Sequence, residues 1–302
     1  MRTAASPLPL TESSSAGIAL LALCGGAVAI AFAPIFVRLS SVGPSATAFW
    51  RLTLALPALW LWVMLAGQGG GTFRRPLSAA DYLRLSAAGL FFAGDLAVWH
   101  WSIRFTSVAN ATLLANFAPI FVALGGWLLF AQKVGLTFLL GMSAALAGTM
   151  LMVGTSLRVD VQHLWGDTLG LITAVFYAGY ILSIKRLRSD FSAATIMAWS
   201  GTVTSAALFP VALLSGEHLL PSSPLGWRPL IGLALISQVG GQGLIAYALA
   251  HLPAAFSSVT LLLQPVMATI FAWLILNETI GPWQALGGVL VLGGIFVARR
   301  VS

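Results

Sequence analysis

Long apolar runs separated by short polar segments dominate the chain. A helix needs roughly 20 mostly apolar residues to cross a bilayer. The runs of about this length cover residues 16–37, 45–66, 83–103, 109–130, 136–154, 167–184, 192–214, 229–250, 254–276 and 282–298. The segments between them are short and rich in Gly, Pro and Ser, as at Ser40–Pro44. This pattern predicts an all-α polytopic membrane protein with ten transmembrane helices.

The second half of the chain repeats the first. Residues 109–153 return in altered form near the C-terminus, shifted by 146 positions, as Pro119 and Pro265 show. The other identities include Trp127 with Trp273, Gly135 with Gly281, Gly141 with Gly287, and Gly148 with Gly294. The match joins the fourth and fifth runs to the ninth and tenth, so each unit has five helices. We therefore expect units at residues 1–155 and 156–302, the second inverted relative to the first, as in many secondary transporters.

Composition and charge support a membrane protein. Hydrophobic residues make up 59% of the chain, charged residues 8%, and the mean hydropathy is +0.94. The net charge of +7 does not indicate nucleic-acid binding, because the basic residues flank the apolar runs. With the N-terminus in the cytoplasm, ten basic residues lie inside and four outside, which favours two cytoplasmic termini. The inside set is Arg2, Arg74, Arg75, Arg84, Lys133, Lys185, Arg186, Arg188, Arg299 and Arg300.

Two stretches carry a family resemblance. One runs from Phe105 through Asn110 to Pro119, and the other from Tyr247 through Gln264–Pro265 to Glu278. They resemble the signatures of the EamA-type branch of the drug/metabolite transporter superfamily. The resemblance implies a ten-helix bundle whose spans 1, 3, 4, 6, 8 and 9 surround a cavity, in a multi-pass exporter of the bacterial inner membrane. Where the family often has Glu before the span 9 proline, this chain has Gln264.

Charged residues inside the predicted spans are the first candidates for a transport site, because charges at membrane depth are costly. Arg51 lies in the second span and Asp95 in the third, at comparable depth. One interpretation is an Arg51–Asp95 ion pair that only stabilises the bundle. The other is that Asp95, or His100 further along the same span, binds a proton during transport.

Polar stripes on the predicted helices are the second group. Thr112, Asn116 and Pro119 share a face of span 4. Each proline should bend its helix and free a backbone carbonyl, and the segment around Pro34 should kink span 1 in the same way. Further stripes comprise Gln238 and Gln242 in span 8 and Thr260 and Gln264 in span 9. Such stripes either line a pathway or join neighbouring helices.

Aromatic residues complete the candidate pathway: Trp99 in span 3, Tyr177 and Tyr180 in span 6, and Tyr247 in span 8. A cavity with aromatic walls and polar donors suits a flat, partly apolar solute. We therefore expect export of amino acids, particularly aromatic or bulky ones. Export of drugs or of other metabolites such as nucleosides is the alternative, and a passive channel is a third, less favoured one.

No sequence motif indicates another class of function. Gly69–Gly71 lacks the GK[ST] of a phosphate loop, and the four histidines are far apart, so neither nucleotide nor metal binding is indicated. We expect no enzyme activity, no cofactor and no nucleic-acid partner, only the bilayer and a small-molecule substrate. Gly141, Gly148, Gly287 and Gly294 give spans 5 and 10 small faces. These spans pack either on each other or on a second protomer, so a monomer and a homodimer both remain open.

Overall fold

A computed structural model describes residues 11–66, 73–106, 108–153 and 164–300, with only the main chain at 11–15, 100, 103–104 and 108–109. The described part is helical and contains no strand. The first half comprises α1 Thr11–Ala31, α2 Ala33–Leu39, α3 Pro44–Thr53, α4 Leu56–Ala66, α5 Ala79–Phe105, α6 Val108–Ala115, α7 Ala118–Phe130 and α8 Leu136–Val153. The second comprises α9 Leu164–Leu187, α10 Ala193–Leu214, η3 Pro224–Gly226, α11 Trp227–Gly232, η4 Leu233–Gln242, α12 Gly243–His251, α13 Ala254–Thr260, α14 Leu263–Leu276 and α15 Pro282–Arg299.

The predicted all-α membrane class is confirmed. Within the described residues, nine helical segments are long and apolar enough to cross a bilayer, counting broken helices such as α1–α2 as one. The remaining predicted span corresponds to α5, a helix of 27 residues that carries Asp81, Arg84 and Asp95. Its charges set α5 apart from the nine, and a tenth crossing stays a prediction.

The predicted proline bends are breaks between short helices. The chain leaves the α-helix at Phe32, between α1 and α2, two residues before Pro34. The same happens between α6 and α7 before Pro119, and between α13 and α14 before Pro265. Proline lacks an N–H and crowds the preceding turn, so the helix restarts with the proline in its first turn, where no donor is needed. A further break between α3 and α4 precedes Pro57 and was not expected.

The eighth span contains a π-helical stretch, which the sequence did not predict. It is η4, Leu233–Gln242, and it continues into α12 without a turn. Glycines on both helices allow η4 to pack closely on α1. A Cβ atom added at Gly26 of α1 would lie 2.8 Å from the carbonyl oxygen of Gly241 of η4. π-Helical turns inside α-helices are often found at functional sites, and this one carries Gln238 and Gln242.

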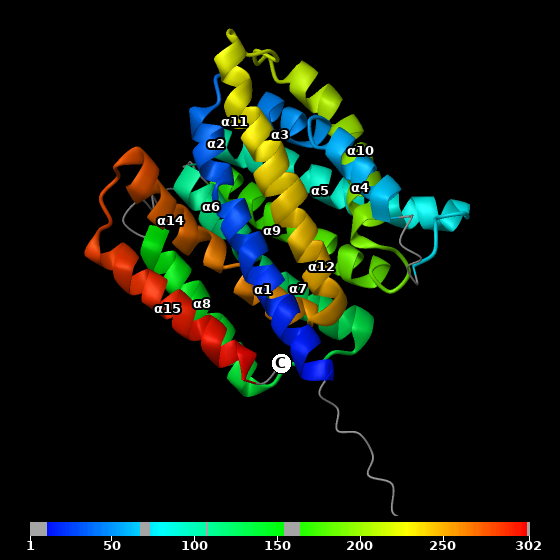
Figure 1. Ribbon diagram of the computed structural model, residues 1–302. Coiled ribbons are helices and arrows are strands. Elements are labelled where there is room, and N and C mark those ends of the chain that lie inside the picture. Colours follow the sequence, from blue (N-terminus) through cyan, green and yellow to red (C-terminus); the bar gives the residue numbers. More distant parts are fainter. Residues whose placement is uncertain (1–10, 67–72, 107, 154–163, 301–302) are drawn as a thin grey trace, which may run out of the picture.

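Helices α8 and α15 lie side by side (Figure 1). Of the two alternatives for their glycine faces, packing on each other is the one that the structure shows. A Cβ atom at Gly148 would lie 2.6 Å from the Gly287 carbonyl oxygen, and one at Gly294 would lie 2.5 Å from that of Gly141. The backbones therefore touch at both glycine pairs. The helices of the predicted fifth and tenth spans thus pack on each other.

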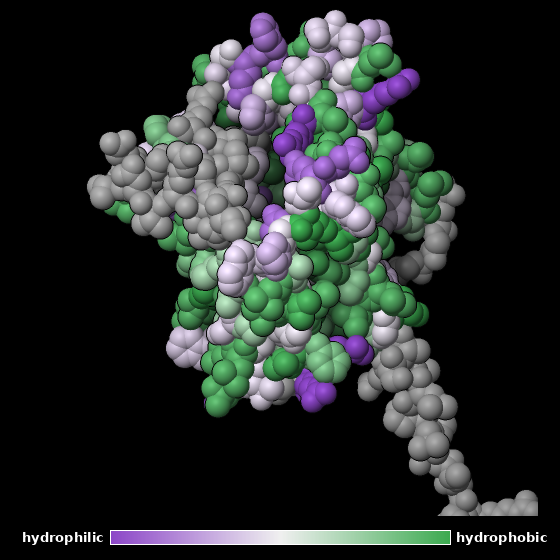
Figure 2. All heavy atoms as spheres, turned by 90° about the vertical axis from the view of Figure 1, so that its left-hand side faces the viewer, coloured by the Kyte–Doolittle hydropathy of each residue, from purple (hydrophilic) through white to green (hydrophobic). Residues whose placement is uncertain are grey.

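The bundle has two distinct ends. The start of α1 and the end of α15 lie at the lower end in Figure 1, here called the termini end, and α2 and α11 lie at the opposite end. The ribbon from α11 through α12 descends to the termini end, and Lys185 Nζ donates to the Leu252 carbonyl oxygen at 3.0 Å. The end of α9 therefore also lies there. Figure 2 shows a face whose lower half is largely hydrophobic, with hydrophilic residues at its lower edge and throughout its upper half.

Candidate functional site

A buried arginine lies where helices of both halves meet. Arg51 of α3 is 9% exposed, and its Nε donates to Gln238 Oε1 of η4 at 2.9 Å. Its guanidinium carbon lies 5.7 Å from the centre of the Phe92 ring on α5. A buried guanidinium needs hydrogen bonds or counter-charge, and within the described part of the chain its terminal Nη atoms donate no hydrogen bond to protein.

Asp95 acts on Arg51 through space. The half-buried carboxylate of Asp95 and the guanidinium of Arg51 interact electrostatically. The ion pairs that the described residues form, with a charged N and a charged O within 4.0 Å, are Arg38–Glu278, Arg74–Asp81, Arg74–Asp190 and Arg84–Asp190. The predicted Arg51–Asp95 pair is therefore a longer-range interaction here, and the guanidinium makes its direct contact with an amide.

Aromatic rings form the wall next to these charges. Tyr180 is 1% exposed and stacks on Phe92, with ring centres 4.4 Å apart and an angle of 14° between the planes. The ring of Tyr177 lies 6.3 Å from that of Tyr180, and its hydroxyl lies near the side chains of Gln264 and Gln242. The structure thus places two predicted tyrosines close to two predicted glutamines.

Four buried side-chain polar atoms have no hydrogen-bond partner among the described residues, and three of them belong to the glutamines near Arg51 and Tyr177. They are Gln238 Nε2, Gln242 Oε1, Ser257 Oγ and Gln264 Nε2. A buried polar atom without a partner costs about 1–3 kcal/mol, so such atoms are usually satisfied by water or a ligand. All four belong to the second half of the chain, whereas the two charges, Arg51 and Asp95, belong to the first. We call Arg51, Asp95 and the three glutamines, together with Phe92, Tyr177 and Tyr180, the central cluster.

Two other predicted pathway residues form hydrogen bonds to the backbone near the breaks in their helices. Asn116 Nδ2 donates to the Thr112 carbonyl oxygen at 2.9 Å, at the break before the buried Pro119. Thr260 Oγ1 donates to the Phe256 carbonyl oxygen at 3.0 Å, at the end of α13. These side chains donate to backbone carbonyls next to the helix breaks, and the Thr112 carbonyl also accepts from the backbone N–H of Asn116. Their place in the substrate pathway stays a prediction.

The remaining predicted residues lie on α5 and α12. Trp99 is half-buried on α5, four residues beyond Asp95, and the side chain of His100 is outside the described residues. Tyr247 is 37% exposed, its ring lies 5.1 Å from that of His251, and it interacts electrostatically with Arg188. These contacts do not join Tyr247 to the central cluster.

Sequence reasoning overlooked Phe92 and the bond between Arg51 and Gln238. Phe92 is one of many phenylalanines in apolar runs, and only its position three residues before Asp95 distinguishes it. Arg51 and Gln238 are 187 positions apart. Their pairing depends on how the two halves dock, for which a single sequence carries no signal.

Comparison with known proteins agrees with this architecture. The model of the EamA-like transporter family matches the chain twice, at residues 17–154 and 164–300. The chain belongs to this family. A solved crystal structure with 17% sequence identity shares the fold, with a TM-score of 0.78 over 96% of this chain and 98% of that chain.

The curated relatives of this EamA-like transporter are also transporters, and those with a named substrate differ in what they export. An uncharacterized transporter of Archaeoglobus fulgidus is 27% identical, over 92% of this chain and 95% of its own. A probable terminal-alkyne amino-acid exporter of Streptantibioticus cattleyicolor is 27% identical, over 90% and 89%. The pseudopaline exporter CntI of Pseudomonas aeruginosa is 23% identical, over 75% and 78%.

In this EamA-like transporter, the two halves meet differently at the two ends of the bundle. At the opposite end, Phe32 and Phe271 stack with ring centres 4.0 Å apart, and Arg38 of α2 pairs with Glu278 after α14. The shift between the repeats is 147 positions in their first part, where Ser45–Ala46 correspond to Ser192–Ala193, and 146 in their last part. With these shifts the four residues correspond to Gly179, Gly125, Lys185 and Gln132 at the termini end. Two glycines cannot stack, and a lysine and a glutamine form no ion pair. Among the described residues, this ring stack and this ion pair are thus found at the opposite end and have no counterpart at the termini end.

Proposed function

We propose that this transporter exports amino acids, with a preference for aromatic or bulky ones, across the inner membrane of a bacterium. The observation that supports this proposal is the pair Arg51 and Asp95, which interact through space without an N–O contact within 4.0 Å. A zwitterion carries one group for each. Its carboxylate would accept from the free Nη atoms of Arg51, and its ammonium would bind the Asp95 carboxylate.

The rest of the central cluster suits the remainder of such a solute. The rings of Phe92, Tyr177 and Tyr180 would pack on an apolar or aromatic side chain. The unpaired amide atoms of Gln242 and Gln264 would complete the hydrogen bonds of the bound solute. The amino-acid exporter among the relatives is consistent with this cargo.

Transport would proceed by alternating access. In our proposal the chain crosses the membrane ten times with both termini in the cytoplasm, as two inverted five-helix units, and the central cluster lies between them. The opposite end would then face outward, where Phe32–Phe271 and Arg38–Glu278 close it. Separation of these contacts would open the site to the outside.

Export of another metabolite or of a drug is the alternative. The pseudopaline exporter among the relatives supports this alternative. Counterflow in proteoliposomes separates the two: unlabelled phenylalanine is loaded inside, labelled phenylalanine is added outside, and an imposed pH gradient is the second variable. We expect transient, saturable accumulation of label. Accumulation only of nucleosides or cationic dyes would support the alternative, and non-saturable leak would indicate a channel.

A further inference from the structure

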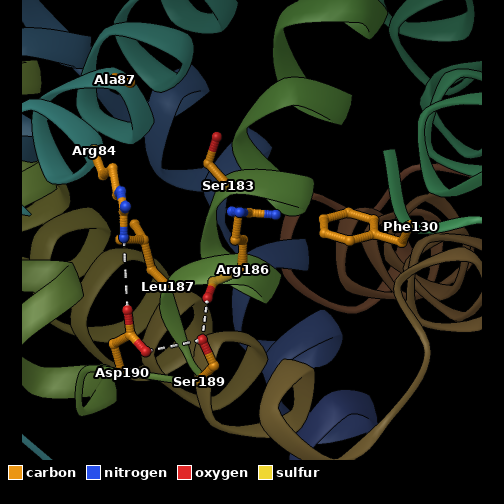
Figure 3. A pocket seen from close by; sticks show the side chains of 8 residues that line it. All are labelled: Arg84, Ala87, Phe130, Ser183, Arg186, Leu187, Ser189 and Asp190. Carbon is orange, nitrogen blue, oxygen red and sulfur yellow. Dashed lines mark hydrogen bonds and ion pairs between the residues drawn. The ribbon is translucent and has the colours of Figure 1, made fainter. Parts of the chain in front are cut away.

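A pocket of about 510 Å³ lies at the termini end, between the start of α5, the end of α7 and the end of α9 (Figure 3). Its volume is in the range of small-molecule binding sites. Unlike the central cluster, it is lined by charged and hydroxyl side chains. These are Arg84, Ser183, Arg186, Ser189 and Asp190, with the Phe130 ring at one side.

The one acidic residue among the lining residues is already balanced. Asp190 Oδ2 lies 3.7 Å from Arg84 Nη1 and 3.5 Å from Arg74 Nη2, and Asp190 Oδ1 accepts from Ser189 Oγ at 3.2 Å. Arg74 in turn forms two hydrogen bonds of 2.6 Å with Asp81. These charges make a connected network of two arginines and two aspartates, with no net charge.

Arg186 is the excess cation of the pocket. Its guanidinium makes no hydrogen bond or ion pair with any described residue, and Figure 3 shows it directed toward Phe130 across the pocket. Its backbone carbonyl oxygen accepts from Ser189 Oγ at 2.7 Å, which holds that hydroxyl next to it. An arginine fork of this kind binds carboxylate or phosphate groups in preference to other ligands.

The repeat explains why the pocket is hollow. With the shift of 147 positions that applies to the first part of the repeats, Ser183 occupies the position that Phe36 has in the first unit. At the opposite end, the Phe36 ring packs so closely on Gly232 that a Cβ atom there would lie 2.7 Å from the ring. That end also contains the carboxylate of Glu278, whose counterpart is Gln132. The termini end thus lacks both the ring and the carboxylate that occupy the opposite end.

We propose that this pocket binds an oxyanion, a carboxylate or phosphate group, through the Arg186 guanidinium and the Ser183 hydroxyl. A pocket between helices at a membrane surface can receive such a group from an anionic lipid head group or from a soluble anion. The inference does not depend on which solute the central cluster transports. Failure of the transport assay would therefore leave it intact.

The test uses the full-length protein in nanodiscs and follows its thermal unfolding midpoint. In the lipid arm, phosphatidylglycerol replaces part of the phosphatidylcholine. In the soluble arm, the nanodiscs contain phosphatidylcholine only, and sodium phosphate replaces sodium chloride at constant ionic strength. Each arm compares the wild type with Arg186→Gln, with Ser183→Phe, which fills the pocket without changing its charge, and with Arg75→Gln. The last removes one exposed arginine near the same end but outside the pocket.

We expect stabilisation of the wild type in one arm, and that arm identifies the source of the oxyanion. Loss of charge-assisted hydrogen bonds should weaken apparent binding about tenfold in Arg186→Gln. Ser183→Phe should abolish it, and Arg75→Gln should bind as the wild type does. The proposal is overturned if neither arm stabilises the wild type, or if Arg186→Gln and Arg75→Gln respond alike.

Discussion

Arg51 lies inside a predicted span, yet its direct side-chain bond is to a neutral amide. Gln238 orients the guanidinium through Nε, which leaves the Nη fork available to a ligand. The carboxylate of Asp95 supplies the compensating charge from a distance. A charge held in this way is costly to bury without a ligand, which is the physical reason for placing the transported solute next to it.

Replacement of Asp95 by Asn should reduce amino-acid counterflow by at least about tenfold, because the substrate ammonium loses a charged acceptor. Asp167→Asn is the matched control, since it retains an oxygen that accepts from Thr106 Oγ1, at 2.7 Å in the wild type. Initial rates in proteoliposomes, normalised to inserted protein, give the comparison. Equal rates for Asp95→Asn and the wild type would remove Asp95 from the site.

Asp81 at the start of α5 makes a separate, pH-dependent contribution to stability. The Arg74 guanidinium holds the pKa of the Asp81 carboxyl well below its usual range, and the N–H of Ser78 and that of Leu77 also donate to it. A carboxyl with a lowered pKa stabilises the fold above its unfolded pKa, near 3.9. That stabilisation is lost as the pH falls toward the folded value.

Asp81→Asn should therefore lower the thermal unfolding midpoint at neutral pH, and the difference from the wild type should shrink only below about pH 4. Unfolding in detergent between neutral and acidic pH measures this. Arg84→Gln serves as the control, because it removes a neighbouring arginine with no contact to Asp81 among the described residues. A wild-type advantage that disappears already near pH 6 would contradict the assignment.

Single residues were only partly predictable. Asp95, Tyr177 and Gln264 could be selected because polar side chains deep in apolar runs are rare. Tyr247 met the same criterion, yet its ring lies against His251. One sequence does not fix the rotation of a helix about its own axis, and that rotation decides which polar side chains face the centre.

At the scale of helices, proline and glycine positions determine the architecture. Breaks precede Pro34, Pro119 and Pro265, and the glycine faces of α8 and α15 bring two backbones into contact. The breaks and the glycine faces were predictable, since they follow from the covalent structure of these residues. The sequence left open whether the two faces pack on each other or on a second protomer. The π-helical stretch η4 was not, because it depends on packing against α1 and α3 rather than on local sequence.

The α8–α15 contact gives a prediction with an adjacent control. Gly294→Ala should lower stability by about 1–3 kcal/mol, because its Cβ atom would lie 2.5 Å from backbone atoms of Gly141 and Ala145. Gly293→Ala should cause no loss, since a Cβ atom there has no neighbour within 4 Å. Thermal unfolding of both variants in detergent checks this. Equal destabilisation by the two substitutions would contradict close backbone packing.

At the scale of the whole molecule, the repeat creates two ends that differ in side chains. The duplication and the family were predictable from the sequence. The difference between the ends was not, because it depends on which of the repeated positions meet across the two units. The structure shows that Phe32, Phe271, Arg38 and Glu278 do meet.

A cross-linking experiment tests whether this closure controls transport. In a Cys24→Ser background, Arg38→Cys combined with Glu278→Cys should be joined by a short bifunctional thiol reagent, because the native side chains are in contact. Counterflow should stop and return after cleavage of the reagent. Lys185→Cys with Gln132→Cys, the repeat-related pair, should retain transport. A cross-linked opposite end that still transports at the full rate would show that it is not a gate.

The claim that a zwitterion binds between Arg51 and Asp95 is tested most directly by competition. Inhibition of labelled phenylalanine counterflow is measured with phenylalanine, with phenethylamine, which lacks the carboxylate, and with 3-phenylpropionate, which lacks the ammonium. We predict that phenylalanine inhibits at concentrations at least about tenfold lower than either analogue, because each analogue leaves one buried charge without its partner. Equal inhibition by phenethylamine or 3-phenylpropionate would contradict the account.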